Sequence, residues 1–579
     1  MKLKYAFIVI ACSVSVLLGQ VLAQDQPPEQ TQRQIPGLFT VTPLTTHGLV
    51  GRSDLAPAVS PDGRWIAYIR FERPGPNVRS AIWLLDRRTG VERVLIPEAS
   101  VEYWGIDFAP DGQAVYVAQS LPPFTEATLV RVRLADRRLE PVRANVGREP
   151  AISPDGRSVA FNRRMSDPPG RELVVAPLES GPERVLARRR RPDALNYPSW
   201  RSDGGAILFR ALDAGHATLL VEVTLADGRE RVMAKPEGWG NASQGAWLPG
   251  GRSFVVTANQ GTEFWRVSYP DGALQRLGFS RPDLYGGLDG AEAAPVIVAV
   301  RRRSEHRLWT ARRDSIEAGV ERPWPYVVAQ PIWTPNEKLL FVRRGAAGAE
   351  LVVTEPAGQE IRSASLAVPA PRYPKFSRNG QVLVWNSYEI GDRSFWRTGP
   401  NGENPVRLTP GPSDFLGHDV SPDGRWLAYT TWASGRFAVW KVELSGGPPT
   451  SLIGEESMVP AISPDGRWVA AYHRASSTHP ERIVIVSTMG GNPVSLGDLP
   501  LAEGGLNWTP DGSAVSFTCA PDGIQNICVV PKAGGRVRQI TAFTEGDVVS
   551  HDWSANGQLL VVRALTAADL VVITIRKDQ

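Results

Sequence analysis

The chain has 579 residues, of which 55 are glycine and 49 are proline, and 42% of the residues are hydrophobic. The hydrophobic content is sufficient for a large core and excludes general disorder, while the many glycines and prolines indicate a globular chain rich in turns. The net charge is only +4, so we expect no nucleic-acid partner bound through bulk positive charge.

Residues 1–23 predict a secretory signal peptide. Lys2 and Lys4 precede the apolar run Ala6–Gly19, and Val21–Ala23 ends in the small residues that a signal peptidase requires. The alternative is an uncleaved N-terminal anchor, because the apolar run barely reaches the length that spans about 30 Å of hydrocarbon. No later stretch approaches that length, so we expect no membrane span after cleavage and a periplasmic or secreted protein.

The next two segments precede the regular part of the chain. Residues 24–37 are rich in Pro and Gln without periodicity and predict an extended tether. Leu38–Thr45 predicts a strand that belongs to no repeat. We expect this strand to close a ring by pairing with a sheet formed late in the chain.

An internal repeat covers almost all of the remaining chain and recurs about every 45 residues. Its marker is the turn Ser-Pro-Asp-Gly or a near-copy of it. The recognisable turns end at residues 63, 112, 156, 204, 251, 337, 380, 424, 466, 512 and 557.

One interval, between Gly251 and Glu337, is about twice the usual length. Its midpoint is Ala294, and the apolar run Pro295–Val300 follows where a strand is expected. The sequence therefore predicts a twelfth, degenerate repeat at this place.

Each repeat combines a tight turn with short apolar strands. Pro fixes φ, Asp suits the turn, and Gly takes the position that needs positive φ. A continuous apolar run such as Trp65–Tyr68 follows, which indicates a strand covered on both faces. Two further strands and a Gly-containing turn complete the unit. Most repeats also carry an aromatic residue just before the turn, such as Trp200 or Trp508, which we expect to pack between neighbouring sheets.

Four antiparallel strands in about 45 residues are typical of a β-propeller blade. The segments Val59–Tyr68 and Val420–Tyr429 carry the repeat most clearly, and this pattern resembles the TolB-like branch of WD-repeat-like propellers. The resemblance covers about residues 38–575. It implies six-bladed rings, but we expect no counterpart of the separate α/β domain that precedes the propeller of TolB.

We therefore expect an all-β fold with two consecutive six-bladed β-propellers made of twelve four-stranded blades. The expected domains are residues 38–318 for the first propeller and 319–579 for the second. We expect a monomer.

The sequence bears on two kinds of chemistry, serine hydrolysis and metal-assisted lysis. Propeller peptidases append an α/β-hydrolase domain with a G-x-S-x-G motif, and the chain contains no such pentapeptide. Some oligogalacturonate lyases resemble this chain in carrying related repeats, and they use His ligands for a divalent cation. Here His418-Asp419 and His551-Asp552 occupy the same register on the innermost strands of two blades, on opposite sides of a six-bladed second ring.

These four residues are therefore the candidate ligand-binding set, at the channel mouth of the second propeller. A ligand or divalent-cation site is one interpretation, and hydrogen bonds that tether the inner strands are the other. We assign no catalytic residue and expect no obligatory cofactor or metal.

Two cysteines remain after signal cleavage. Cys519 and Cys528 flank a short loop between two β-like runs, and facing positions of a hairpin can satisfy disulfide geometry. An oxidising compartment would keep the bond closed, so we expect a disulfide.

The favoured function is an exported, non-catalytic propeller scaffold that binds a protein, peptide or glycan partner in the cell envelope. The alternative is a channel-sited enzyme, a metal-assisted lyase or a hydrolase of saccharides or lactones, that uses the His418, Asp419, His551 and Asp552 set.

Overall fold

The structure of the chain is a computed structural model in which the regular elements are β-strands. It describes residues 39–46, 57–73, 79–121, 127–147, 149–166, 169–190, 195–212, 218–235, 245–258, 261–279, 283–291, 296–325, 330–345, 348–367, 371–389, 392–409, 415–433, 436–454, 456–474, 482–497, 499 and 501–575. The predicted signal peptide and tether lie outside these residues, so their assignments stay predictions.

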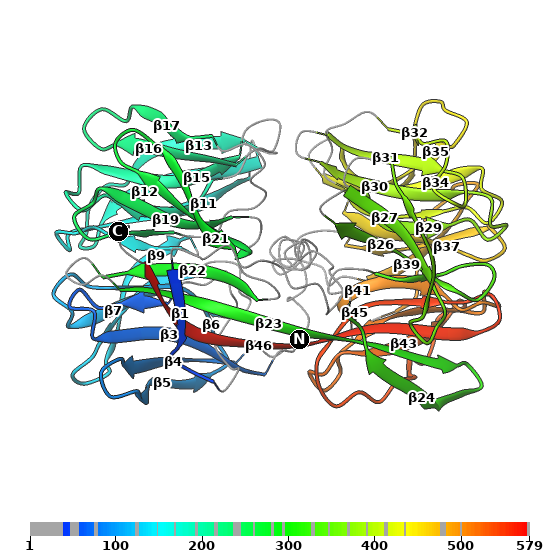
Figure 1. Cartoon of the computed structure of the whole chain (residues 1–579), viewed down its shortest axis with the longest axis horizontal. Helices are drawn as coiled ribbons and strands as arrows, with labels where there is room; N and C mark the ends of the chain where they lie inside the picture. The colour runs from blue at the N-terminus through cyan, green and yellow to red at the C-terminus, as the bar shows by residue number, and fades with distance from the viewer. Residues whose placement is uncertain are drawn as a thin grey trace. The chain divides into compact units, whose positions relative to one another are not determined.

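The described strands form ten four-stranded sheets and one six-stranded sheet (Figure 1). Each four-stranded sheet consists of consecutive antiparallel strands in chain order, as expected for propeller blades. The fold is therefore all-β, as the repeat predicted.

Contacts divide the chain into two compact units. Among the described residues, unit N comprises residues 39–303 and 566–575, and unit C comprises residues 304–565. The expected boundary at 318/319 falls inside strand β24 (Ser315–Pro323), whereas the contacts place the division between Arg303 and Ser304. The final strand segment, from Thr566, returns to unit N.

Unit N contains five four-stranded sheets. Their strands are β2 (Ala58–Val59), β3 (Trp65–Arg73), β4 (Arg79–Asp86) and β5 (Val91–Ala99); β6 (Glu102–Phe108), β7 (Ala114–Ser120), β8 (Ala127–Arg133) and β9 (Leu139–Val146); β10 (Ala151–Ile152), β11 (Ser158–Ser166), β12 (Pro169–Pro177) and β13 (Arg184–Arg190); β14 (Leu195–Trp200), β15 (Ala206–Leu212), β16 (Thr218–Thr224) and β17 (Glu230–Ala234); and β18 (Ala246–Trp247), β19 (Ser253–Ala258), β20 (Glu263–Ser268) and β21 (Leu274–Phe279).

Unit C likewise contains five four-stranded sheets. Their strands are β25 (Ile332–Trp333), β26 (Leu339–Gly345), β27 (Gly348–Thr354) and β28 (Glu360–Ser365); β29 (Pro371–Phe376), β30 (Leu383–Glu389), β31 (Asp392–Thr398) and β32 (Val406–Arg407); β33 (Phe415–Val420), β34 (Trp426–Ala433), β35 (Arg436–Glu443) and β36 (Thr450–Ile453); β37 (Ser457–Ile462), β38 (Trp468–His473), β39 (Arg482–Ser487) and β40 (Val494–Ser495); and β41 (Leu501–Trp508), β42 (Ala514–Cys519), β43 (Asn526–Pro531) and β44 (Arg538–Gln539).

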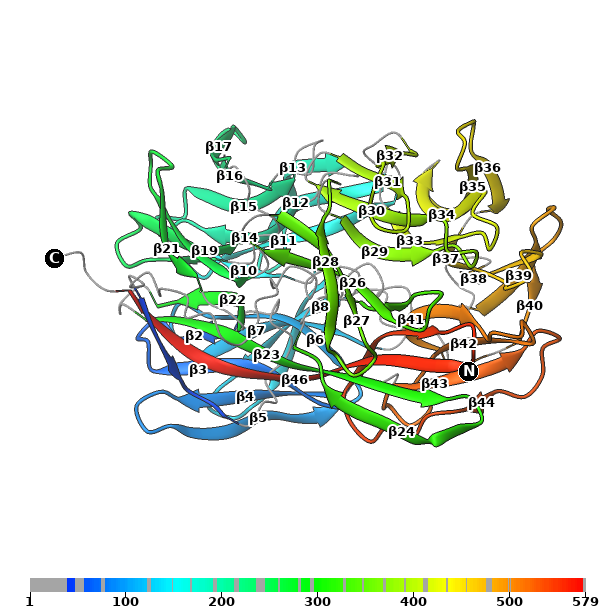
Figure 2. The same cartoon turned by 45° about the vertical axis from the view of Figure 1, so that its right-hand side comes forward.

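The six-stranded sheet contains two unusually long strands, β23 (Ile297–Arg312) and β46 (Gln558–Ile575), which lie side by side (Figures 1 and 2). Each contributes residues to both units. The remaining strands of this sheet are β1 (Phe39–Pro43), β22 (Leu284–Gly290), β24 and β45 (Asp547–Trp553).

The register separates this sheet into two four-stranded sets. In unit N, β22 pairs with the first part of β23, and β1 pairs with the end of β46. In unit C, β45 pairs with the first part of β46, and β24 pairs with the end of β23. The strand predicted at Leu38–Thr45 therefore exists as β1, and it pairs antiparallel with β46, the last strand of the chain.

The repeat turn owes its shape to one recurring set of hydrogen bonds. In the first copy, the Ser60 hydroxyl donates to Asp62 Oδ1 at 2.6 Å, and the same oxygen accepts from the backbone N–H of Arg64 at 3.0 Å. These bonds lower the pKa of Asp62, with the Ser60 bond as the largest cause. Gly63 closes the turn at φ +70°, a conformation that glycine adopts without strain.

The aromatic residues before the turns pack between sheets, as the sequence predicted. Trp200 and Trp508 are buried, and the indole N–H of each donates at 2.9 Å to a carbonyl of the preceding sheet, that of Ala151 and Ala461 respectively. Apolar residues of neighbouring sheets form continuous clusters around them. The first strands of successive sheets are thereby held at fixed positions.

Candidate functional site

Two aspartates on first strands of unit N bind the backbone of another sheet. Asp107 in β6 accepts a hydrogen bond from the N–H of Ile152 at 2.7 Å, and Asp289 in β22 accepts one from the N–H of Val59 at 2.7 Å. The Asp107 bond reaches the next sheet along the chain. The Asp289 bond links the last sheet of unit N to its first.

Unit C repeats this arrangement. Asp419 in β33 accepts from the N–H of Ile462 in the next sheet at 2.7 Å, and Asp552 in β45 accepts from the N–H of Trp333 at 2.9 Å. The Asp552 bond again links the last sheet of the unit to its first. Two of the four predicted site residues therefore bridge first strands through their carboxylates.

Burial shifts the pKa of all four aspartate side chains, although each keeps some accessible surface. Burial raises the pKa of Asp107 to about 8, with Asp289 as the second cause, and burial raises the pKa of Asp289 to about 7. Burial also raises the pKa of Asp419 and Asp552, but Lys375 opposes the increase for both.

In unit C, a lysine side chain acts on both Asp419 and Asp552. Lys375 in β29 has the same place relative to its repeat turn as Asp419 and Asp552, and it acts electrostatically on both. Arg378, in the following turn, donates from Nη2 to the carbonyl of Pro510 at 3.3 Å, three sheets further along the chain. Lys375 acts against burial on the pKa of both carboxyls, and Arg378 does so on that of Asp552.

The two predicted histidines are buried, and their contacts are with neighbouring sheets. The Nε2 atom of His551 lies 2.9 Å from the Ser516 hydroxyl oxygen, and the ring of His418 lies 4.9 Å from that of Phe395. Burial lowers the pKa of each histidine to about 3, and Lys375 contributes to the decrease. Both imidazoles are therefore neutral at physiological pH.

Within the described residues, no three His, Cys, Asp or Glu side chains are grouped so that they could hold a metal ion. A disulfide joins Cys519 and Cys528, the two cysteines that the sequence analysis paired, at a Cα–Cα distance of 5.8 Å. No described helix is long and apolar enough to cross a membrane.

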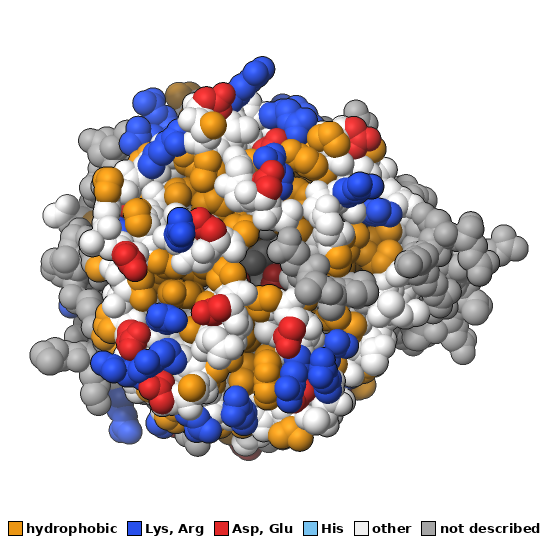
Figure 3. All heavy atoms as spheres, turned by 90° about the vertical axis from the view of Figure 1, so that its left-hand side faces the viewer, with side chains coloured by type: hydrophobic (Ala, Val, Ile, Leu, Met, Phe, Trp, Pro, Cys, Tyr) orange, Lys and Arg blue, Asp and Glu red, His pale blue; other side chains and the backbone are white. Residues whose placement is uncertain are grey.

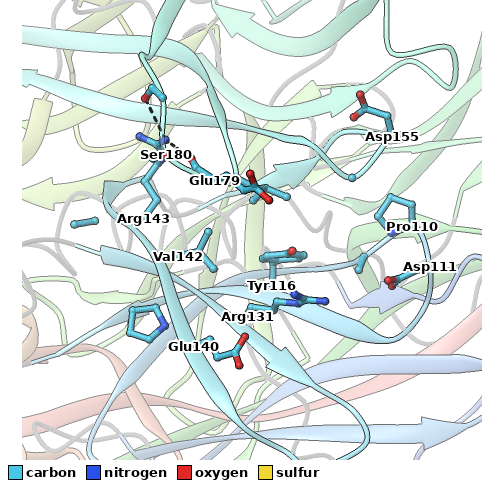
Figure 4. A pocket seen from close by; sticks show the side chains of 16 residues that line it. Pro110, Asp111, Tyr116, Arg131, Glu140, Val142, Arg143, Asp155, Glu179 and Ser180 are labelled. Atoms are coloured by element: carbon cyan, nitrogen blue, oxygen red, sulfur yellow. Dashed lines mark hydrogen bonds between the residues drawn. The ribbon is translucent and has the colours of Figure 1, made fainter.

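Unit N also carries a pocket of about 880 Å³, bounded by the sheet β6–β9 and by turns of the following sheet (Figure 4). Its lining includes Asp111, Tyr116, Arg131, Glu140 and Asp155. Charged side chains of both signs are interspersed over the face seen in Figure 3, which is hollowed near its middle.

Sequence reasoning missed several of these residues. Asp107 and Asp289 share the register of Asp419 and Asp552, so reading that register in every repeat would have found them. The pocket around Arg131 left no signal in the sequence, because its residues come from separate strands and turns.

The comparisons with known proteins agree with the repeat. Residues 128–240 match the family described as the lipoprotein LpqB beta-propeller domain. An uncharacterized protein of Agrobacterium fabrum is 30% identical over 123 residues, which are 19% of this chain and 42% of that protein. The chain thus matches less than half the length of this curated relative.

Three solved structures are also similar. A putative TolB from Agrobacterium tumefaciens is 21% identical and covers 46% of this chain and 99% of its own, with a TM-score of 0.37. The tricorn protease is 11% identical and covers 92% and 61%, with a TM-score of 0.31. An oligogalacturonate lyase in complex with manganese is 13% identical and covers 72% and 95%, with a TM-score of 0.29. The match of residues 128–240 to a β-propeller family agrees with the resemblance to TolB-like β-propellers that the Ser-Pro-Asp-Gly repeats indicate.

Proposed function

We propose that the protein is an exported, non-catalytic scaffold of two six-bladed β-propellers that binds a protein, peptide or glycan partner in the cell envelope. The observation that carries the proposal is the closure of each unit by an aspartate. The bonds from Asp289 to Val59 and from Asp552 to Trp333 join the sixth four-stranded set of each unit to the first.

A ring closed in this way is suited to binding because its framework is rigid. The carboxylates that could perform chemistry on the first strands already accept backbone hydrogen bonds, and His551 contacts Ser516. Breaking such bonds would leave buried donors unpaired, at a cost of about 1–3 kcal/mol each. Loops and turns around a rigid scaffold are free to vary and to carry a partner-binding surface.

The alternative function is a channel-sited, metal-assisted lyase or a hydrolase of saccharides or lactones. It is favoured by one observation, the pKa of Asp419 and Asp552, which burial raises, because a raised pKa suits a carboxyl to act as a general acid. In this version Asp419 and Asp552 contact the substrate, and His418 and His551 complete the site.

Metal analysis and affinity capture separate the two functions. Protein beginning at Gln24, dialysed without chelator, is analysed for Mn, Ca and Zn beside its His418→Ala variant. The same two proteins are cross-linked to an envelope extract. The scaffold predicts equal capture of one partner by both proteins, whereas the enzyme predicts a stoichiometric metal that the variant loses. A failure to capture any partner would contradict the scaffold.

Export is tested separately by sequencing the amino terminus of the mature protein. Cleavage predicts a chain that begins at Gln24 in the periplasmic or secreted fraction. A chain retained in the membrane with Met1 intact would instead support the anchor.

A further inference from the structure

The pocket of unit N contains an arginine that the fold leaves without a partner. Arg131 lies in β8 between Tyr116 of β7 and Glu140 of β9, as their cross-strand pairing shows. It makes no hydrogen bond or ion pair with any residue that the structure describes, and its Nε is buried. The terminal Nη1 and Nη2 atoms of Arg131 also have no hydrogen-bond partner among the described residues, so a ligand that offers an acceptor can pair with them.

The neighbouring Arg143 shows the contrast. Its Nη2 donates to the carbonyls of Pro177, Glu179 and Gly181 at 2.8, 3.2 and 3.4 Å. This guanidinium fastens the turn after β12 to β9, and Figure 4 shows it turned towards that turn. Arg143 is therefore structural, whereas the donors of Arg131 remain available.

Four carboxylates line the same pocket, and two of them, Asp111 and Asp155, belong to repeat turns. Asp111 Oδ1 accepts from the N–H of Gln113 at 2.9 Å, and Asp155 Oδ1 accepts from the Ser153 hydroxyl at 2.6 Å. The Oδ2 atoms of both aspartates accept no hydrogen bond within the described part of the chain. Each turn thus fixes one oxygen of its aspartate and leaves the other as an acceptor for a ligand.

This combination restricts the charge of a ligand. Arg131 only donates, the aspartates only accept, and the Tyr116 hydroxyl can do both. A simple anion would face Asp111 and Asp155, and a simple cation would face Arg131. A sugar is uncharged, and each of its hydroxyls both donates and accepts within a small space. The pocket volume of about 880 Å³ lies within the usual range of ligand sites.

We propose that the pocket formed by Asp111, Tyr116, Arg131 and Asp155 binds a neutral saccharide, with Arg131 donating to its hydroxyls and the two aspartates accepting from them. This site is separate from the closure of the rings, and it goes beyond the proposed scaffold function. The scaffold could bind its envelope partner even if this pocket were empty.

Isothermal titration of the mature protein with maltotriose, cellotriose and N,N′-diacetylchitobiose tests the proposal. We expect at least one of these neutral sugars to bind. We expect Arg131→Ala to weaken that binding at least tenfold and Tyr116→Phe, which retains the packing of the ring, to weaken it by a smaller factor. Thermal unfolding of each variant verifies that it is folded.

Arg397 provides the matched control. It holds the same register in unit C as Arg131 in unit N and also has a buried Nε without a partner, but its cross-strand neighbours are Val384 and Val406. Arg397→Ala should leave sugar binding unchanged. The proposal would be overturned if Arg397→Ala weakened sugar binding as much as Arg131→Ala, or if Arg131→Ala left sugar binding unchanged. Binding of galacturonate or glycine in preference to every neutral sugar would also overturn it. Absence of binding by all three sugars would overturn it as well.

Discussion

The carboxylate of Asp289 accepts a hydrogen bond from the backbone N–H of Val59 at 2.7 Å, although 230 residues separate them in the chain. The corresponding bond in unit C joins Asp552 to Trp333 across 219 residues at 2.9 Å. Asp107 makes the same kind of bond across only 45 residues, to the next sheet. The same type of hydrogen bond, from a backbone N–H to an aspartate carboxylate, therefore links neighbouring sheets and also joins the last sheet of each unit to its first.

Removing a closing carboxylate should weaken unit N. Asp289→Ala leaves the N–H of Val59 without an acceptor, and we expect a loss of about 1–3 kcal/mol in the free energy of unfolding. Asp289→Asn retains an acceptor oxygen and should lose little when both variants are compared near pH 4. Urea unfolding measures the free energy of unfolding of both variants. Equal losses would show that the side-chain acceptor at position 289 does not stabilise unit N.

The stability of the protein should fall as pH rises through neutrality because of Asp107 and Asp289. Their folded pKa values, about 8 and about 7, lie above the ordinary value of 3.8, so the folded state holds more protons between pH 4 and 8. Their contribution to stability is complete below pH 4 and is lost progressively towards pH 8, with a slope of up to about 1.4 kcal/mol per pH unit and group.

The variant that combines Asp107→Asn with Asp289→Asn should abolish this slope. It should be more stable than the natural protein at pH 8 and similar to it near pH 4. Unfolding in urea at several pH values measures the difference, and an unchanged slope in the double variant would contradict the assignment.

The buried histidines should act in the opposite direction. The folded pKa of His418 and His551 is about 3, below the ordinary value of 6.5, so the unfolded chain takes up the protons first on acidification. Their contribution is present above pH 6.5 and is lost as pH falls towards 3. His551→Asn should flatten the acid limb of the stability curve, and His473→Asn, at a less buried position, should flatten it less.

Removing the end of the chain should open unit N and spare unit C. Deletion of residues 566–579 removes the part of β46 that pairs with β1, whereas deletion of 576–579 removes no described strand residue. Hydrogen exchange should increase over β1 and β22 only in the longer deletion. Equal exchange in the two proteins would show that β46 is not needed to close unit N.

Reduction of the disulfide should destabilise the hairpin of β42 and β43. A loop of this size contributes about 2–3 kcal/mol through the entropy of the unfolded chain. The double variant Cys519→Ser and Cys528→Ser should lose a similar amount in thermal unfolding without reductant. If reductant shifts the variant as much as the natural protein, the shift does not come from this bond.

The sequence by itself determined the repeat, because turn chemistry and strand periodicity are local. The Ser60, Asp62 and Gly63 turn needs only its own hydrogen bonds, and the Trp200 and Trp508 positions follow from fixed places in each repeat. The disulfide was equally predictable, since Cys519 and Cys528 face each other across one hairpin.

Only the tertiary structure decided how the units close and where their sites lie. β23 and β46 serve both units, and this arrangement depends on pairing between strands more than two hundred residues apart, which no local pattern records. The same holds for Asp289 and Val59. The pocket lined by Arg131 and Asp155 likewise combines residues of two successive sheets. Such contacts depend on long-range burial and register, so they exist only once the sheets have been assembled.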